Sequence, residues 1–485
     1  MGALVAAVNK KKENVVPTVV AMLQELTHRG NDGHGIATPT LTTTATAIED
    51  LELIDCVSSI ALGHNLSCIL PRDSLQPVQG KTFTFVFEGR MFPAPNLPDQ
   101  SELKEFRTQL GSNPLKNASR ILEKLCGSYV FAVAEAKKIV VGRDVFGATP
   151  LYYGENETVC AVASERKALW KLGLENVHSF PPGQIAIINE QGFSFHVVKE
   201  LRMHPKEKLN METAARALQT LLLESTRKQV SDIEAVAVAF SGGVDSSVVA
   251  ALAKNVGLDV QLVSVGLKDQ PEVMFTKEAA EALDLPLHIQ TYTVSELEQT
   301  LAKVLWLIEE PHVVNACIAV PFYWLAETAS KLGHPVVLAG QGADELFGGY
   351  QRYLTEYEKS GVEAVEQKMF YDTKKAYHQN FQRDNQICSY HGVELRLPFI
   401  DCDVVDFGLR LPLRLKINSV EDRLRKRVLR HVAQNLDIQS FIANKPKKAV
   451  QYTTGVTKAL QRLAKVESSM LREYVEKTFS KVFSS

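Results

Sequence analysis

The stretch from 235 to 254 constrains the fold of this chain more than any other. AVAVAF at 235–240 predicts a buried strand, and SGGVDSS follows directly at 241–247. The two glycines remove side-chain bulk at the turn, and VDSSVVAALAK predicts a helix from about Asp245 to Lys254. A strand that turns through small residues into a helix indicates a ligand that comes close to the backbone.

The chemistry of this turn suits a phosphate group with a metal ion. A helix N-terminus has free N–H groups and about half a positive charge. The hydroxyl groups of Ser241, Ser246 and Ser247 add further donors to phosphate oxygens. Asp245 repels anions by itself, but it fits as a Mg²⁺ ligand because the metal can bridge a carboxylate and phosphates. The turn is not a Walker A loop, and GKT at 80–82 lacks the first glycine that such a loop needs.

The pattern along the chain predicts two domains, 1–205 and 206–485. The first contains short β-like runs broken by turns, which is typical of antiparallel sheets with a few packed helices, an α+β arrangement. After about residue 213, strands alternate with helices, which predicts an α/β domain with a parallel sheet. The remainder is mostly helical. We place the boundary in the polar segment 202–213.

Composition excludes several classes of protein. The chain has 485 residues and a net charge of −2, which argues against a general nucleic-acid surface. No apolar run reaches the roughly 20 residues needed to cross a membrane, and no basic segment precedes the apolar N-terminus. The seven cysteines form no CxxC pair, so we expect reduced, mostly buried thiols and no zinc site. These features predict a soluble, cytoplasmic protein.

Several motifs resemble one enzyme family. SGGVDSS is similar to the pyrophosphate-binding loop of ATP pyrophosphatases, which cleave ATP between the α and β phosphates and adenylate a substrate. GQGADELFGGY at 340–350 and GVELRLPFID at 392–401 resemble the asparagine synthetase segments SGEGADELFGGY and GVEARVPFLD. KPKK at 445–448 matches a family lysine, and HRGNDGHG at 28–35 resembles the glutaminase domain. The chain is therefore identified as a member of the asparagine synthetase family.

The resemblance implies a fold for each half of the chain. Residues 1–205 are expected to form an αββα sandwich of the N-terminal-nucleophile (Ntn) type, similar to a class II glutamine amidotransferase domain. Residues 206–485 are expected to form a parallel-sheet, HUP-like ATP-pyrophosphatase domain with a helical C-terminal part. ATP and Mg²⁺ are the implied cofactors, and a homodimer is the implied assembly.

The resemblance also assigns roles to individual residues. Asp245 and Asp344 are the implied metal ligands. The implied nucleotide contacts are Ser241, Gly242, Gly243, Asp245, Ser246, Ser247, Gly266, Leu267, Gly340, Gln341 and Gly342. Asp344 and Lys447 are implied catalytic residues, with Lys447 neutralising charge that builds on pyrophosphate or the acyl phosphate. The alternative for Lys447 is a surface lysine in a basic run.

Two further assignments concern the acid substrate and a basic segment. Arg396 and Glu394 are implied to orient a carboxylate substrate, because arginine binds carboxylates with two hydrogen bonds. The alternative for this pair is a structural salt bridge. RLRKR at 423–427 is interpreted as a solvated helix face.

Four positions depart from the family pattern. Position 2 is Gly2 where the family has its nucleophilic cysteine, and Glu88 replaces a donor amide of the oxyanion hole with an acceptor. Asn65 stands where the family has a glutamine-binding arginine. We therefore expect no glutamine hydrolysis. Gln341 replaces the glutamate thought to accept a proton from the attacking amine, and an amide cannot be a general base.

The departures leave two functions open. Glu345 and Glu310 are candidate substitutes for the missing base. The first function is an ATP-dependent ligase that adenylates a small, aspartate-like carboxylate and transfers ammonia or another amine. The second is a non-catalytic interaction or regulatory protein that retains the fold. A tRNA-modifying pyrophosphatase lacks support, since the chain has no paired cysteines and no basic excess.

Overall fold

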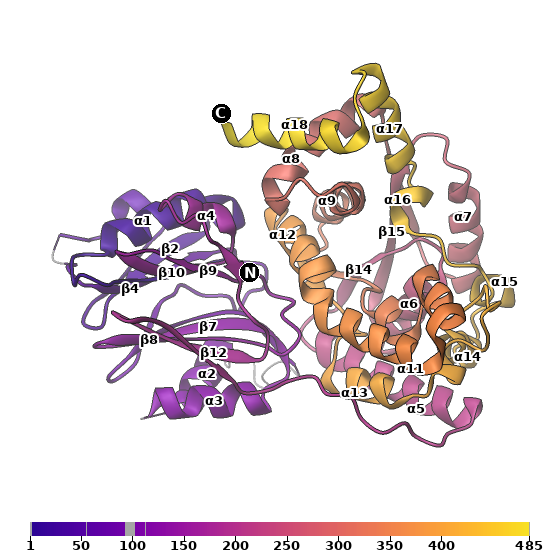
Figure 1. The fold of residues 1–485 in the computed structure, drawn as a ribbon, viewed down its shortest axis with the longest axis horizontal. Coiled ribbons are helices and arrows are strands. Elements are labelled where there is room, and N and C mark those ends of the chain that lie inside the picture. The colour runs from indigo at the N-terminus through magenta and orange to yellow at the C-terminus, as the bar shows by residue number, and fades with distance from the viewer. Residues whose placement is uncertain (1, 55, 93–101, 112, 485) are drawn as a thin grey trace. The chain divides into compact units, whose positions relative to one another are not determined.

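The structure is a computed structural model that describes residues 2–54, 56–92, 102–111 and 113–484. It divides into two compact units, Met1–Glu200 and Leu201–Ser485, each considered by itself below (Figure 1). The division lies slightly before the expected boundary at 205/206. Residues 201–205 join the second unit, where His204 Nε2 lies 3.4 Å from Asp406 Oδ1.

The described part of the first unit contains two antiparallel sheets. One has the strand order β11-β9-β10-β1-β4-β2-β3, and the other has the order β13-β12-β8-β7-β6-β5. The first sheet consists of β1 (Ala3–Asn9), β2 (Gly33–Ala37), β3 (Thr42–Ala45), β4 (Ile60–Leu66), β9 (Tyr152–Glu155), β10 (Val159–Ala163) and β11 (His178–Ser179). The second consists of β5 (Val78–Gln79), β6 (Thr84–Met91), β7 (Gly127–Glu135), β8 (Lys138–Arg143), β12 (Gln184–Asn189) and β13 (Gly192–Val197).

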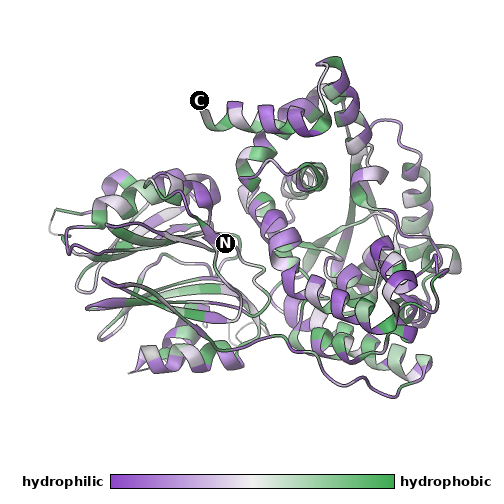
Figure 2. Ribbon diagram, in the orientation of Figure 1, coloured by the Kyte–Doolittle hydropathy of each residue, from purple (hydrophilic) through white to green (hydrophobic). Residues whose placement is uncertain are grey.

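The alternation of side chains along β1 explains the layers. Leu4 and Val8 face the second sheet in a shared core, whereas Ala3 and Val5 face the opposite side. There they pack with α1 (Val16–Glu25) and α4 (Arg166–Trp170). The outer face of the second sheet packs against α2 (Glu102–Leu110) and α3 (Pro114–Lys124). Figure 2 shows long hydrophobic stretches on these strands. The expected αββα sandwich is confirmed.

The second unit is built on a parallel sheet with the order β16-β15-β14-β17-β18 in its described residues. Its strands are β14 (Ala235–Ala239), β15 (Asp259–Leu267), β16 (Leu287–Tyr292), β17 (Val336–Leu338) and β18 (Glu394–Arg396). The chain adds β15 and β16 on one side of β14, then β17 and β18 on the other. Ligands of such sheets bind at the carboxyl ends of the strands where this reversal occurs, here between β14 and β17.

Helices surround this sheet and make up most of the C-terminal part (Figure 1). They are α5 (Met211–Val230), α6 (Val244–Asn255), α7 (Glu272–Leu283), α8 (Val294–Ile308), α9 (Val313–Lys331), α10 (Ala343–Phe347), α11 (Gln351–Ala376), α12 (Gln382–Tyr390), α13 (Cys402–Arg410), α14 (Arg427–Asn435), α15 (Ser440–Ala443), α16 (Val450–Thr453), α17 (Val456–Val466) and α18 (Leu471–Ser484). Short 3₁₀ and π turns are η1 (Thr27–Arg29), η2 (Ile48–Asp50), η3 (Tyr377–Phe381) and η4 (Leu413–Leu415). The expected parallel-sheet domain with a helical C-terminal part is confirmed.

The longest apolar helices lie inside this unit. Residues of α8 and α9 form one core with the sheet, including Leu301, Leu305 and Trp324. Within the described residues no single helix is both long and apolar enough to cross a membrane. Helices α8 and α9 are long and apolar enough only when taken as a pair, and the chain bends by 109° between them.

Candidate active site

The loop between β14 and α6 lies at the centre of the parallel sheet. Gly242 has a φ of +65°, and a Cβ there would lie 3.1 Å from the ring of Phe275. Glycine is thus required at 242 for its conformation and its packing. Ser246 ties the loop to the first turn of α6: its Oγ accepts the N–H of Ser241 at 3.3 Å and donates to the Gly243 carbonyl at 3.1 Å.

The loop after β17 comes close to the same helix turn. A Cβ on Gly340 would lie 2.9 Å from the Cβ of Asp245, so a larger residue at 340 would collide with α6. Gly342 has a φ of +90° and precedes α10, whose first turn carries Asp344. These two glycines allow the loops after β14 and β17 to bring their carboxylates to one place.

Two aspartates and two lysines form a charge cluster there. Lys426 Nζ lies 2.5 Å from Asp245 Oδ2 and 2.5 Å from Asp344 Oδ1. Lys447 Nζ lies 2.7 Å from Asp344 Oδ2 and 3.5 Å from Asp245 Oδ2. The site therefore balances two negative charges with two positive ones before any ligand is added.

The cluster shifts the pKa values of Asp344 and Lys447. Burial alone would raise the pKa of Asp344, but Lys426 and Lys447 outweigh it and hold that pKa well below the usual range. Burial alone would lower the pKa of Lys447, but Asp344 and Asp245 outweigh it and raise that pKa. Both groups are therefore charged at neutral pH.

The interpretation of 423–427 as a solvated helix face is wrong for part of that segment. Lys426 is 0% exposed, and Arg425 is buried with its Nε donating to the Gly349 carbonyl at 3.0 Å. Both residues have left-handed backbones just before α14, with a φ of 52° at Arg425 and 51° at Lys426. The turn sends Lys426 inward because the two aspartates compensate its charge. Charge pattern alone cannot distinguish this lysine from its exposed neighbours.

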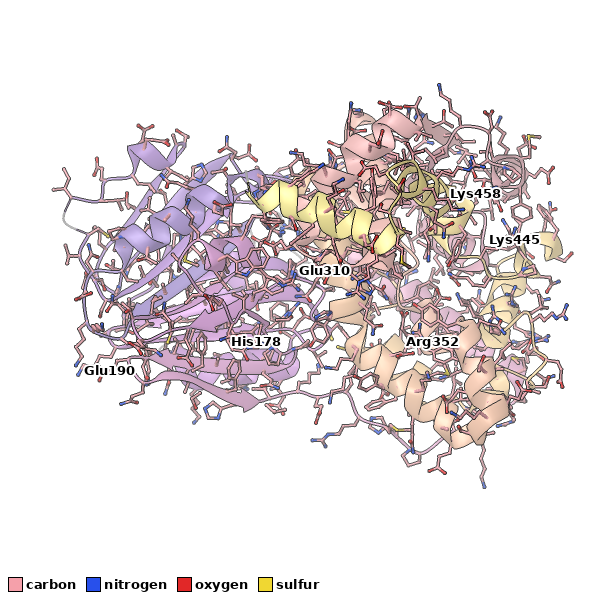
Figure 3. All side chains as sticks on the ribbon, turned by 45° about the horizontal axis from the view of Figure 1, so that its top comes forward. His178, Glu190, Glu310, Arg352, Lys445 and Lys458 are labelled. Atoms are coloured by element: carbon pink, nitrogen blue, oxygen red, sulfur yellow. The ribbon has the colours of Figure 1, made fainter. Side chains whose placement is uncertain are left out.

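A cleft of about 1410 Å³ opens beside the cluster. Glu310 and Arg352, both labelled in Figure 3, belong to its lining. The expected site residues that line it are Ser241, Asp245, Ser246, Gly266, Leu267, Gly340, Gln341, Gly342, Asp344 and Lys447. Gly242, Gly243 and Ser247 lie in the same loop and helix turn but are not part of the lining.

One end of the cleft is formed by β15 and the segment around α16. The Leu267 N–H donates to the Thr454 carbonyl at 3.0 Å, and a Cβ on Gly266 would lie 3.4 Å from Thr454 Cα. Gln451 and Tyr452 line the same part of the cleft. Backbone and flat side chains near the phosphate loop suit a planar heterocycle. The sequence analysis identified Gly266 and Leu267 but missed the residues of α16.

The two candidate bases also line the cleft. Glu345 is buried and accepts from the Tyr350 hydroxyl at 2.5 Å and from Asn380 Nδ2 at 2.8 Å. Burial, and next the negative charge of Asp344, raise its pKa. Glu310 accepts a hydrogen bond from Asn315 Nδ2. Both carboxylates are thus already engaged by neighbouring donors.

Arg396 and Glu394 are not part of the cleft lining in the described residues. Arg396 is 2% exposed, and its Nε lies 2.7 Å from Glu394 Oε1 while its other nitrogens bind Asp232 at 2.5 and 2.8 Å. The pair sits on β18, a strand that the sequence analysis did not predict. The expected substrate-orienting role of Arg396 and Glu394 is therefore corrected in favour of a structural salt bridge. The guanidinium of Arg396 binds Glu394 and Asp232 inside the protein.

The positions that depart from the family in the first unit form a closed cluster. The Gly2 N–H donates to Glu88 Oε1 at 2.6 Å, and Glu88 Oε2 lies 3.0 Å from His64 Nε2. Burial would raise the pKa of Glu88, but the His64 contact and nearby positive charge lower it to about 2. A Cβ at position 2 would lie 1.9 Å from the Asn65 carbonyl oxygen. Position 2 therefore has no room for any side chain.

Asn65 itself is turned to other partners. Its Nδ2 donates to the Leu23 carbonyl at 2.8 Å, and its Oδ1 lies 2.7 Å from His34 Nδ1. The cavity beside Glu88 and His64 has a volume of about 30 Å³. That is the space of about one or two water molecules, and it is too small for an amino acid.

Among the described residues, no group of three or more His, Cys, Asp or Glu residues could hold a metal ion by itself. No disulfide forms, and the cysteines Cys56, Cys160, Cys317 and Cys388 are buried, Cys126 and Cys402 are partly buried, and Cys68 is exposed.

Comparisons with known proteins agree with this architecture. A family model described as asparagine synthase matches residues 217–363 and 354–482, and one described as a glutamine amidotransferase domain matches 1–179. The chain is 30% identical over 500 aligned residues to "Putative asparagine synthetase (glutamine-hydrolyzing) 1" of Methanocaldococcus jannaschii, with 92% of each chain covered. It is 25% identical over 457 residues to "Asparagine synthetase (glutamine-hydrolyzing)" of Homo sapiens, covering 85% of this chain and 79% of that one.

Likenesses to solved structures are weaker. Glutamine phosphoribosylpyrophosphate amidotransferase from B. subtilis has a TM-score of 0.37 and 18% identity, covering 59% of this chain and 65% of that one. NMN synthetase from Francisella tularensis has a TM-score of 0.28 and 14% identity, covering 57% and 93%.

The two family models define the class of protein: a glutamine amidotransferase domain followed by an asparagine synthase domain. The chain belongs to the asparagine synthetase family. Membership makes it an ATP-dependent ligase of the amide-forming class, with a glutamine amidotransferase domain in its first unit.

Proposed function

We propose that this chain adenylates a small, aspartate-like carboxylate with ATP and transfers ammonia or another amine to it without hydrolysing glutamine. The observation that carries the proposal is a contrast between the two units. A large cleft with the charge cluster of Asp245, Asp344, Lys426 and Lys447 is present in the second unit. In the first unit, position 2 has no space for a nucleophilic side chain.

The nucleotide is proposed to lie across the ends of β14, β15 and β17. The adenine lies against Gly266 and Leu267, and the phosphates lie against the loop at 241–243 and the N-terminus of α6. The cleavage between the α and β phosphates leaves AMP on the acid and releases pyrophosphate. Lys447 and Lys426 are placed to balance the charge of the leaving pyrophosphate.

Magnesium is proposed as the second cofactor, and Asp245 and Asp344 would hold it. Asp245 Oδ1 is buried and has no hydrogen-bond partner among the described residues, so it is a free acceptor for a cation. Mg²⁺ is usually bound by one or two carboxylates together with substrate phosphates, which fits this pair. When bound, the ion would neutralise phosphate charge and polarise the bond that breaks.

The acid and the amine are proposed to react near Gln341, which lies in the loop after β17 and lines the cleft. The carboxylate oxygen of the acid attacks the α phosphorus, and the amine nitrogen then attacks the carbonyl carbon of the acyl adenylate. Gln341 replaces the family glutamate, so the side chain beside the amine in this chain is an amide and not a carboxylate. The cleft has room for both the acid and the amine.

The test is acid-dependent pyrophosphate release. Purified protein is incubated with ATP, Mg²⁺, a panel of amino and other carboxylic acids, and ammonium chloride, hydroxylamine or glutamine. We expect pyrophosphate and AMP with at least one acid, an amide or hydroxamate by mass spectrometry, and no glutamate from glutamine. Binding of ATP·Mg²⁺ without release for any acid would instead support the non-catalytic function. Glutamate formation would contradict the loss of glutaminase activity.

Two further properties are proposed on the family resemblance. We propose a homodimer in the cytoplasm, because members of this family often pair. Analytical ultracentrifugation of the full chain, with and without ATP·Mg²⁺, tests the assembly, and a single species at the monomer mass would overturn it.

A further inference from the structure

Gln341 makes one contact that determines which way its amide points. Its Nε2 donates to Asp384 Oδ2 at 2.9 Å. Gln341 lies in the loop after β17 and lines the cleft, whereas Asp384 lies on α12 and is 0% exposed. The contact therefore joins a residue in the cleft to a buried carboxylate behind it.

Chemistry permits only one orientation of the amide. A carboxylate accepts hydrogen bonds and cannot donate them, so Asp384 requires the N–H₂ side of Gln341. The reversed amide would set two acceptor oxygens against each other in a buried place. The amide oxygen of Gln341 is not among the buried unpartnered atoms of the described residues, and the side chain borders the cleft. That oxygen thus faces the cleft as a hydrogen-bond acceptor.

Asp384 is itself held rigidly. Arg383 Nε lies 2.8 Å from Asp384 Oδ1, and a second guanidinium nitrogen lies 3.1 Å from Oδ2. The third guanidinium nitrogen donates to the Gln379 carbonyl at 2.9 Å and to Asn315 Oδ1 at 3.3 Å. Burial raises the pKa of Asp384, and the donors Arg383 and Gln341 favour its charged form. Each partner in this network fixes the next.

We propose that Asp384 is a positioning residue that holds the oxygen of Gln341 toward the acyl adenylate, where it accepts an N–H of a neutral attacking amine. This inference rests on the proposed function and deepens it. An amide oxygen accepts a hydrogen bond but does not remove a proton at neutral pH, so the amine must enter as its free base. Free-base ammonia is therefore the reacting form, and ammonium bound at the same oxygen does not react.

The step balances without an added reagent. The lone pair of ammonia forms the C–N bond, the bond between the carbonyl carbon and the AMP oxygen breaks, and AMP leaves with that electron pair. One proton is lost from the new nitrogen to solvent in the cleft. Arg383 and Cys388 interact electrostatically with Asp384, and Glu310, Glu345 and Asp344 line the same cleft as Gln341.

The test compares two half-reactions in Asp384→Asn and the unaltered protein. Asparagine fits the same volume but presents both a donor and an acceptor, so Gln341 can reverse. We expect KM for ammonia to rise about tenfold, the effect of one lost oriented hydrogen bond. Acid-dependent ATP–pyrophosphate exchange should stay within about twofold, because that half-reaction needs no amine. The thermal midpoint of each variant checks folding.

A pH profile provides the second readout. For the unaltered protein, kcat/KM for total ammonia should rise in proportion to the free-base fraction. In the double variant Gln341→Glu with Asp384→Asn, a carboxylate faces the cleft and can accept the proton, so the profile should flatten.

Three outcomes overturn the inference. One is an equal loss of exchange and amide formation in Asp384→Asn, which indicates a purely structural role. Another is an unchanged KM for ammonia in that variant. A third is a flat profile in the unaltered protein, which indicates that a separate base deprotonates ammonium. Absence of exchange in the unaltered protein with every acid is distinct from all three and overturns the proposed function together with this inference.

Discussion

Each unit contains a buried carboxylate at a position that belongs to a family motif, but the two carboxylates differ in whether their oxygens have partners. In the second unit Asp245 retains a buried oxygen without a partner, beside a cleft of about 1410 Å³. In the first unit both oxygens of Glu88 are used, one by the Gly2 N–H and one by His64. The cavity beside them has only about 30 Å³.

The difference teaches that a fold and a binding site depend on different features of the sequence. The αββα layers need only alternating apolar residues, which the strands of the first unit retain. A binding site needs acceptors and donors that neighbours leave unsatisfied until the ligand arrives. The cluster around Asp245 meets that condition, and the one around Glu88 does not.

Removing the buried lysine tests the open cluster most severely. In Lys426→Met, Asp245 and Asp344 each lose one ion-pair partner and retain Lys447. Removing one partner of a buried ion pair costs about 3–5 kcal/mol, so we expect a loss of about 3 kcal/mol in the free energy of unfolding. Urea unfolding at pH 7 measures it. Lys448→Met is the matched control, since Lys448 is 62% exposed and should change stability by less than about 0.5 kcal/mol. Equal effects of both substitutions would contradict the cluster.

Lys447→Met tests the catalytic use of the same cluster. Lys447 lines the cleft and is 27% exposed, so its loss should disturb folding less than the loss of Lys426. We expect kcat for pyrophosphate release to fall about 10²–10³-fold, the usual effect of removing one preorganised charge from a reacting group. Steady-state kinetics with saturating ATP measure this, with Lys458→Met as the control because Lys458 is exposed and is not part of the cleft lining. A fall of less than threefold would make Lys447 the surface lysine that its sequence context also allowed.

Glu88→Gln tests the closed cluster through pH. The pKa of Glu88 is lowered from 4.5 to about 2, so its charge stabilises the fold above pH 4.5 and that contribution is lost as the pH falls toward 2. Glutamine keeps the shape but not the charge. We expect the variant to be less stable at pH 7 by about 2–3 kcal/mol, with the difference shrinking between pH 5 and 3. Thermal midpoints across that range measure it, with exposed Glu49→Gln as a control that shows no such trend. A gap that is constant with pH would contradict the role of the Glu88 charge.

The sequence predicted the part of the site that depends on local conformation. Gly242 and Gly340 are needed for backbone turns and close approaches that a strand-loop-helix pattern reveals. The strand at 235–239 and the helix at 244–255 lie within a residue or so of their expected bounds.

The part that depends on long-range packing was not predictable. Lys426 lies in a basic run whose other members are solvated or bonded elsewhere, and only the three-dimensional approach of Asp245 and Asp344 selects it. Arg396 illustrates the reverse, because a motif resemblance placed it in the site while Asp232 binds it inside the protein. Asp384 was missed because nothing near it in sequence indicates a contact with Gln341.

Substitution at position 2 gives the smallest expected change and the sharpest test of the closed cluster. A Cβ there would lie 1.9 Å from the Asn65 carbonyl oxygen, a backbone atom of β4 that can move only with its strand. Gly2→Cys and Gly2→Ala should therefore both lose about 1–3 kcal/mol of stability, the usual cost of overpacking, because they share the clash. Gly2→Cys should also release no glutamate from glutamine, even where mass spectrometry shows the cysteine at the N-terminus. A stable Gly2→Cys variant that hydrolyses glutamine would show that β4 yields easily, and that the first unit lacks only its nucleophile. If Gly2→Cys loses stability and Gly2→Ala does not, the cause is the thiol and not a lack of space at position 2.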